Sequence, residues 1–209
     1  MKSRNLLFVL FLINSLYSNA QRYDRYSSEN PFRLSIGFLA IDDSFSSENQ
    51  LFNFKDNWSF SRLPTRFSGE YVFTKNVSAE VSFSHVKYDP GKLVDGEFTK
   101  DNITFTAIDL NVKYDLNGVL DLIVDVPYNF DPYLITGIGM VSIKDYERLS
   151  GNFGGGAHFW FWHESDYDYG LRQLYKRLGL FAQVQGRYDI NAIPGGRQIQ
   201  YSAGVICRF

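Results

Sequence analysis

Alternation between apolar and polar residues is the dominant pattern of the chain, and it is clearest in the segment Gln198–Phe209. One face of this segment carries only apolar or aromatic side chains: Ile199, Tyr201, Ala203, Val205, Cys207 and Phe209. The opposite face carries polar residues or glycine at every position except Ile206. A repeat of two residues is that of a β-strand, whose successive side chains point to opposite faces. The pattern therefore predicts a strand with one apolar and one polar face.

Seven further strands are predicted upstream. Five of them alternate in the same way: Phe32–Ile41, Thr65–Phe73, Val77–Lys87, Ile103–Tyr114 and Leu178–Tyr188. Tyr133–Ser142 is apolar on both faces, so its orientation does not follow from the pattern. Phe153–Trp162 combines a run of glycines with aromatic residues on both faces. Glycine inside a strand marks a bend or a close approach, which a small curved barrel needs, so both segments are interpreted as strands.

Two architectures fit these strands, a secreted soluble β-protein and a transmembrane barrel. Aromatic residues make up 17% of the chain, with 14 Tyr and 19 Phe. A soluble core does not need so many, whereas a membrane barrel places aromatic girdles at both interfaces. After residue 20 the sequence has no apolar stretch of helix length, and only helices and closed barrels satisfy their backbone groups in lipid. The sequence therefore predicts an all-β fold, an eight-stranded antiparallel up-and-down transmembrane β-barrel.

The first twenty residues have the features of a cleaved signal peptide. Lys2 and Arg4 precede an apolar run at Leu6–Leu12, and Ser18 and Ala20 place small residues before a cleavage point at Gln21. The apolar run is too short for a membrane span, which needs about 20 residues. The expected organisation is a signal peptide at 1–20, an N-terminal periplasmic segment at 21–31 and the barrel at 32–209.

Three stretches make the chain resemble a known family. They are FTAIDLNVKYDL at Phe105–Leu116, FDPYLITGIG at Phe130–Gly139 and the terminal YSAGVICRF. On these stretches the chain resembles the small eight-stranded outer-membrane barrels of the OmpA transmembrane domain and OmpX. The resemblance covers about Phe32–Phe209 and implies the outer membrane of a Gram-negative bacterium. It also implies an assembly signal in the last strand, carried by Tyr201, Val205 and Phe209. Some relatives continue into a peptidoglycan-binding domain, which is not expected in a chain that stops at Phe209.

An even number of strands places both termini in the periplasm, and this assigns a side to every connection. The outer loops are expected at Asp42–Pro64, Tyr88–Asn102, Lys144–Asn152 and Asp189–Arg197. The first outer loop contains four large apolar residues, namely Leu51, Phe52, Phe54 and Trp58. Such a loop is expected to pack over the barrel mouth or to contact lipid or a partner.

The periplasmic connections differ from the short turns usual in such barrels. Only Thr74–Asn76 is short, whereas Asp115–Pro132 and His163–Arg177 are long and partly apolar. Two interpretations remain open: amphipathic turns that lie in the inner-leaflet interface, or a docking surface for a periplasmic or membrane protein partner. The residues of this candidate partner surface are Val119, Leu120, Leu122, Ile123, Val124, Leu171, Leu174 and Tyr175.

The inward faces of the predicted strands carry a cluster of charges. Its members are Arg33, Arg66, Glu70, Glu80, Asp109, Lys113, Arg187 and Arg208. If Phe73 pairs with Val77 across a three-residue turn, Glu70 lies opposite Glu80, and two adjacent carboxylates need cations between them. Eight strands leave a lumen just wide enough for side chains to fill. The sequence therefore predicts a lumen filled by ion pairs, with a gated proton or ion path as the alternative.

Little in the sequence points to catalysis or to a cofactor. The formal net charge of −2 argues against a nucleic-acid partner, and the single cysteine excludes an intrachain disulfide. His85, near Ser84 and Asp89 at the outer rim, is the one arrangement that suggests a lipid-modifying enzyme, and its spacing is not diagnostic. No cofactor or metal site is expected.

The remaining hypotheses concern binding. The first is a non-enzymatic scaffold or subunit of an envelope complex, surrounded by outer-membrane lipid and bound to a periplasmic or membrane protein. The alternative is a surface-exposed binding or adhesion barrel, which rests on the aromatic first loop. A narrow channel has less support because of the strand number.

Overall fold

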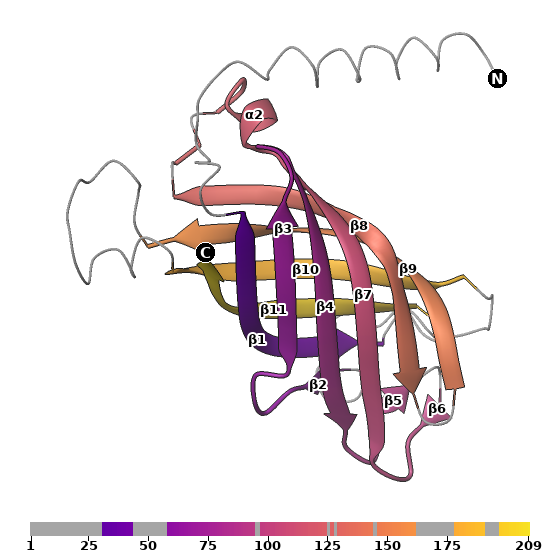
Figure 1. The fold of residues 1–209 in the computed structure, drawn as a ribbon. Coiled ribbons are helices and arrows are strands. Elements are labelled where there is room, and N and C mark those ends of the chain that lie inside the picture. The colour runs from indigo at the N-terminus through magenta and orange to yellow at the C-terminus, as the bar shows by residue number, and fades with distance from the viewer. Residues whose placement is uncertain are drawn as a thin grey trace, which may run out of the picture.

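Eight long antiparallel strands form a closed barrel in the computed structural model (Figure 1). The structure describes residues 31–43, 58–94, 97–124, 126–127, 129–143, 146–161, 178–190 and 197–209. The barrel strands are β1 (Phe32–Asp42), β3 (Arg66–Val72), β4 (Val77–Tyr88), β7 (Ile103–Asp115), β8 (Phe130–Ile143), β9 (Tyr146–Trp160), β10 (Leu178–Asp189) and β11 (Arg197–Arg208). The expected signal peptide, 1–20, lies outside the described residues.

The strands follow one another around the barrel in chain order, and the first and last close it. β1 pairs with β11 over a register that runs from Arg33 opposite Arg208 to Asp42 opposite Ile199. Beyond that register, the Phe209 N–H donates a 2.7 Å hydrogen bond to the Phe32 carbonyl. The predicted fold class, an up-and-down antiparallel barrel of eight strands, is confirmed. Among the described residues, no helix is both long and apolar enough to cross a membrane.

The outer surface of the barrel is apolar and its interior is largely polar, as the two-residue repeat predicts. The large apolar side chains that remain exposed on the outer face include Phe32, Leu34, Ile36, Phe67, Val81, Phe83, Ile108, Leu110, Val112, Leu180, Val184 and Val205. This arrangement is the reverse of a soluble β-protein and is that of a barrel whose outer face meets lipid. The alternation therefore gave the correct outward face for the strands in which it is regular.

The structure resolves the orientation of β8, which the sequence left open. Tyr133 and Ile135 point into the barrel with 4% and 1% exposure, whereas Leu134 and Ile138 face outward. β8 also begins at Phe130 and not at Tyr133, so the second periplasmic connection is shorter than predicted. Both faces of β8 are apolar because part of the lumen is itself apolar.

The predicted outer loop Lys144–Asn152 is wrong. β9 already begins at Tyr146, so only residues 144–145 separate it from β8. The outward positions at this end of β9 are occupied by Glu147, Leu149 and Gly151, which together do not make an apolar face. The alternation that identifies the other strands is therefore absent from the sequence here.

Short elements occupy the connections. β2 (Trp58–Phe60) pairs with the end of β1, and β5 (Leu93–Val94) pairs with β6 (Glu97–Phe98). Trp58 is 7% exposed and stacks on Tyr201 with 4.7 Å between ring centroids, so it packs on the barrel wall. Leu51, Phe52 and Phe54 of the same predicted loop lie outside the described residues. α2 (Asn117–Leu120) follows β7 at the end of the barrel opposite β5 and β6 (Figure 1).

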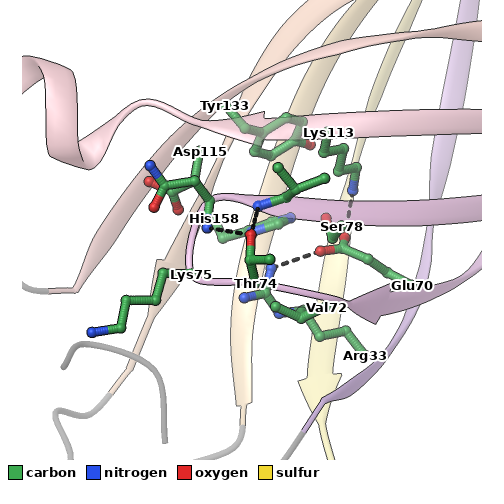
Figure 2. A pocket seen from close by; sticks show the side chains of 12 residues that line it. Arg33, Glu70, Val72, Thr74, Lys75, Ser78, Lys113, Asp115, Tyr133 and His158 are labelled. Carbon is green, nitrogen blue, oxygen red and sulfur yellow. Dashed lines mark hydrogen bonds and ion pairs between the residues drawn. The ribbon is translucent and has the colours of Figure 1, made fainter. Parts of the chain in front are cut away.

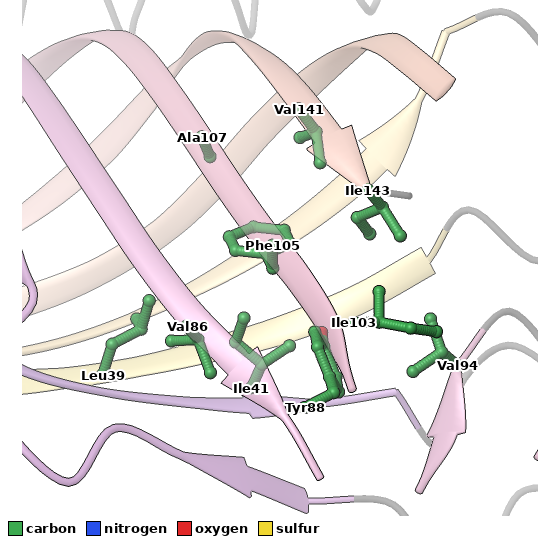
Figure 3. Packing of buried hydrophobic residues seen from close by; sticks show 10 residues of the cluster. All are labelled: Leu39, Ile41, Val86, Tyr88, Val94, Ile103, Phe105, Ala107, Val141 and Ile143. Atoms are coloured by element: carbon green, nitrogen blue, oxygen red, sulfur yellow. The ribbon is translucent and has the colours of Figure 1, made fainter. Parts of the chain in front are cut away.

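The interior divides into two parts along the barrel axis. The barrel end that holds both chain termini is called the periplasmic end below, after the sidedness expected from the sequence, and the opposite end is called the extracellular end. Toward the extracellular end lies a compact group of apolar side chains, called the outer apolar core below (Figure 3). Its members are Leu39, Ile41, Val86, Tyr88, Val94, Ile103, Phe105, Ala107, Val141 and Ile143. Val94 belongs to the β5–β6 hairpin and is 1% exposed, so the hairpin contributes to this core. The inward residues nearer the chain termini are mostly polar or charged.

Candidate functional site

The periplasmic charge cluster consists of Arg33, Arg66, Glu70, Glu80 and Lys113. Glu70 lies directly opposite Glu80 in the β3–β4 register, the pairing that a three-residue turn predicts. Both carboxylates point into the barrel and are 3% and 1% exposed. The three cations come from β1, β3 and β7, which lie next to one another around the barrel together with β4. Their convergence follows from the inward orientation of alternate residues on neighbouring strands.

Every carboxylate oxygen of Glu70 and Glu80 lies against a cation. Arg33 Nη1 lies 2.7 Å from Glu70 Oε1, and Arg66 Nη2 lies 2.8 Å from Glu80 Oε1. Lys113 Nζ lies 2.7 Å from Glu70 Oε2 and 2.7 Å from Glu80 Oε2. Lys113 therefore bridges the two glutamates and offsets the repulsion that two adjacent carboxylates would otherwise feel.

Aromatic rings surround the cations of this cluster. Lys113 Nζ lies 4.6 Å from the Tyr133 ring centroid, and the Arg33 guanidinium lies 5.7 Å from that of Trp160. Arg208, predicted to join the charges, lies 4.6 Å from the same Trp160 ring. Trp160 therefore lies between two arginines of the predicted charge cluster. Such cation–π contacts add most where the cation is removed from water.

Asp109 and Arg187 form a separate group farther along the lumen. Arg187 Nη2 lies 2.8 Å from the Asp109 carboxylate, and Asn152 donates a 3.1 Å hydrogen bond to Asp109 Oδ1. Arg187 Nη1 also donates to Ser150 Oγ at 3.1 Å. The eight predicted lumen charges therefore all lie inside the barrel, with Asp109 and Arg187 paired to each other.

Sequence reasoning missed a third polar group at the periplasmic end. Asp131 accepts hydrogen bonds from Asn117 Nδ2 at 2.8 Å and from Trp160 Nε1 at 2.6 Å. Asp131 was assigned to a turn because β8 was predicted to begin two residues later, at Tyr133. Asn117, at the start of α2, gave no signal in the sequence.

A small cavity opens at the periplasmic end of the charge cluster (Figure 2). Thr74 and Lys75 of the first periplasmic turn line it together with Glu70, Lys113 and His158. Its volume is about 20 Å³, which is room for about one water molecule. A substrate larger than that does not fit in this cavity.

The rim residues considered for catalysis do not come together. His85 is exposed on the outer face, where its Nδ1 lies 3.1 Å from Thr106 Oγ1, whereas Ser84 is fully buried on the inner face. Asp89 lies 3.5 Å from Arg62 in an exposed ion pair. The geometry therefore contradicts a Ser–His–Asp arrangement here. Within the described residues, no group of three His, Cys, Asp or Glu side chains could hold a metal ion.

The candidate partner surface is partly visible. Val119 and Leu120 of α2 are half-buried, whereas Leu122, Ile123 and Val124 are 64%, 78% and 62% exposed. Leu171, Leu174 and Tyr175 lie outside the described residues. An exposed apolar segment thus follows α2 at the periplasmic end of the barrel.

The residues predicted to carry an assembly signal lie along the outer face of β11. Val205 is 44% exposed and Phe209, just beyond the strand, is 50% exposed. Tyr201 is half-buried because Trp58 stacks on it. The structure gives their positions and does not test the signal.

Comparison with known proteins identifies the fold. The chain is similar to the N-terminal β-barrel domain of Pseudomonas aeruginosa OprF, with a TM-score of 0.51, 14% identity, and coverage of 87% of this chain and 100% of that one. Neisserial surface protein A matches with a TM-score of 0.50, 14% identity, and coverage of 87% and 98%. No protein-family model and no curated protein sequence matches the chain. At these identities the likeness shows the fold, an eight-stranded barrel of the outer-membrane type.

The exposed apolar side chains on the outer face of the barrel indicate the environment in which this fold is stable. Side chains such as Leu110, Ile138 and Val205 are about half exposed on the barrel wall, and water would disfavour that exposure. A barrel satisfies all its backbone groups internally, so the same surface is stable in lipid. The fold and this apolar outer face together place the protein in a bacterial outer membrane.

Proposed function

We propose that the protein is a non-conducting, non-enzymatic scaffold of the outer membrane that holds a periplasmic protein partner. The observation that carries the proposal is the set of side chains that point into the barrel. Ion pairs lie in the periplasmic part, and the outer apolar core and the Arg148–Asp189 pair lie in the extracellular part, which supports a filled lumen. A barrel without a passage acts through its outer surfaces and its ends.

Two barriers of different kinds support a non-conducting lumen. At the periplasmic end, Lys113 and its two glutamates lie across the interior, beside a cavity of only about 20 Å³. At the extracellular end, Phe105 and Tyr88 are fully buried in the outer apolar core, and the buried Arg148–Asp189 ion pair lies at the same end of the barrel. A hydrated ion would have to break the first barrier and lose its water at the second.

The segment after α2 supports a role in docking. Ile123 is 78% exposed, and burying a side chain of this size against a partner is favourable by about 1.5–3 kcal/mol. The sequence from Asn117 to Pro127 contains two aspartates and no Lys or Arg. Segments that lie on an anionic lipid surface are usually rich in Lys and Arg. The composition therefore favours a protein partner over the inner-leaflet interface.

The alternative, a surface-exposed adhesion barrel, has less support. It rests on the apolar residues of the first outer loop, and Trp58 is buried against Tyr201. Trp58 therefore stabilises the barrel wall and offers little surface to a ligand outside the cell.

The scaffold is tested by two measurements on the full-length barrel. Planar-bilayer recordings of the purified protein are expected to show no large, steady conductance. Purification from detergent-solubilised membranes is expected to retain a stoichiometric partner that Ile123→Asp releases. Asn76→Asp, which adds the same single negative charge to the neighbouring periplasmic turn, is the matched control and should retain it. A porin-like current would refute the filled lumen, and equal partner recovery for both variants would refute the docking surface.

A further inference from the structure

A groove runs along the outer face of β8 to β11 near the extracellular end of the barrel. It is a shallow, open hollow of about 600 Å³. Gly151 and Gly186 form its floor, while Phe153, Tyr188 and Ile199 stand beside them on the adjacent strands. Phe153 and Tyr188 are 67% and 54% exposed, so both rings project from the wall. The groove lies on the surface that faces lipid and does not belong to the lumen.

The two floor glycines are not required by the packing of the barrel. A Cβ added to Gly186 would meet only the Phe153 carbonyl oxygen at 3.5 Å, and one on Gly151 only the Tyr188 carbonyl oxygen at 4.0 Å. Neither residue has a positive φ, which among the described glycines occurs only at Gly91. By contrast, a Cβ on the adjacent inward Gly154 would collide with the Val184 carbonyl oxygen.

Glycine weakens a strand, and inside strands it often marks a place where a ligand approaches closely. At Gly154 the barrel's own backbone explains the missing side chain. At Gly151 and Gly186 the space above the backbone is open to the membrane. The missing side chains there create room for a molecule that lies against the wall.

A cation lies at the extracellular end of the same groove. Arg197 is the first residue of β11, is exposed, and pairs with Tyr188, whose ring centroid lies 5.1 Å from its guanidinium. A guanidinium held over an aromatic face keeps its donors free for a planar or tetrahedral anion and suits phosphate well. The groove therefore combines an apolar trough at membrane depth with a phosphate-type contact at the interface.

We propose that this groove binds one acyl chain of a lipid in the extracellular leaflet, with the phosphate of its headgroup against Arg197. The charge of Arg197 selects an anionic lipid over a zwitterionic one. The open floor at Gly151 and Gly186 lets the chain lie close to the barrel between the two aromatic rings. This site is independent of the periplasmic docking surface, so either proposal can fail alone.

The test is native mass spectrometry of the folded, detergent-solubilised barrel titrated with phosphatidylglycerol or phosphatidylcholine carrying identical chains. Wild-type protein is expected to retain phosphatidylglycerol about five-fold better, the preference that one interfacial arginine provides. Arg197→Gln should bind both lipids equally. Arg62→Gln, which removes another exposed arginine, should leave the preference unchanged.

Filling the floor tests the trough separately. Gly186→Leu is expected to lower the retention of both lipids by the same factor, because it occupies the space of the chain. Gly69→Leu, at an outward glycine of β3 outside the groove, is the matched control and should bind as wild type. The electrophoretic shift on heating verifies that each variant is folded. Unchanged lipid preference in Arg197→Gln, or wild-type retention in Gly186→Leu, would overturn the proposal.

Discussion

The two halves of the lumen solve the same packing problem with different chemistry. β1, β4 and β7 each cross both halves, and the inward face of each strand changes character midway. On β4, Ser78, Glu80 and Ser82 face the lumen in the periplasmic half, and Val86 and Tyr88 face it in the extracellular half. The strand geometry is the same throughout. The comparison teaches that one barrel can hold a network of directional ion pairs at one end of its interior and a close-packed apolar cluster at the other.

The two halves should differ in what disturbs them. In the periplasmic charge cluster the favourable energy depends on complete pairing, because an uncompensated charge in the interior is costly. In the outer apolar core it depends on filled volume, because a lost methyl group leaves a cavity. Substitutions that keep the volume of a side chain but change its charge should therefore lower the stability most in the periplasmic charge cluster. Substitutions that keep the charge but reduce the volume should lower it most in the outer apolar core.

The largest effect is expected from the double substitution Glu70→Gln/Glu80→Gln. It relieves the repulsion between the two carboxylates but leaves Arg33, Arg66 and Lys113 without their anions. The free energy of unfolding should fall by about 3–5 kcal/mol, the usual cost of breaking a buried pair. Urea unfolding of the barrel in detergent micelles measures it. A double variant as stable as the wild type would favour the gated-path interpretation over a structural role.

A somewhat smaller loss is expected from Ile41→Ala in the outer apolar core. Ile41 is fully buried, and truncating such a residue costs about 2–5 kcal/mol because the cavity is only partly filled by relaxation. The same urea unfolding measures this loss. Ile36→Ala on the same strand is the matched control, since Ile36 faces outward and mobile lipid or detergent can occupy the space. Equal losses for the two variants would show that packing inside the outer apolar core adds no more stability than contacts on the outer face.

The smallest effect is expected from Arg62→Gln. Arg62 pairs with Asp89 at 3.5 Å, but both side chains are well exposed. Exposed ion pairs contribute about 0–1 kcal/mol, so the unfolding midpoint in urea should hardly move. A loss of stability comparable to that of the double glutamate variant would contradict the view that the lumen ion pairs contribute more than Arg62–Asp89 because they are buried.

The sequence predicted the polar half of the lumen better than the apolar half. Apolar and polar residues alternate regularly where the outer face meets lipid and the inner face carries charges. The two-residue period therefore predicted that Glu70 and Glu80 point inward, and the length of the turn between their strands predicted that they pair. In the outer apolar core the inward residues resemble the outward ones. Tyr133–Ser142 gave no orientation from its sequence because its inward side chains are apolar in both halves: Val141 in the outer apolar core, and Tyr133 and Ile135 nearer the charge cluster.

The missed polar contacts have a different cause. Asp131 and Asn117 form their hydrogen bond between a strand end and a short helical turn, where no periodic pattern exists. Their proximity depends on the path of the connection after β7. The inward side chains could thus be predicted only where the strands alternate regularly, and the groove at Gly151 could be recognised only from the assembled outer wall.

The seam between β1 and β11 also limits the order in which the barrel can form. Its residue pairs, such as Arg33 with Arg208, join segments at opposite ends of the barrel sequence. Such non-local contacts carry a loop-closure entropy cost and slow folding. Until β11 arrives, β1 presents an unpaired edge that could pair with another chain. Productive folding therefore requires that this edge be shielded during export, and closure of the seam is expected to be a late step of assembly.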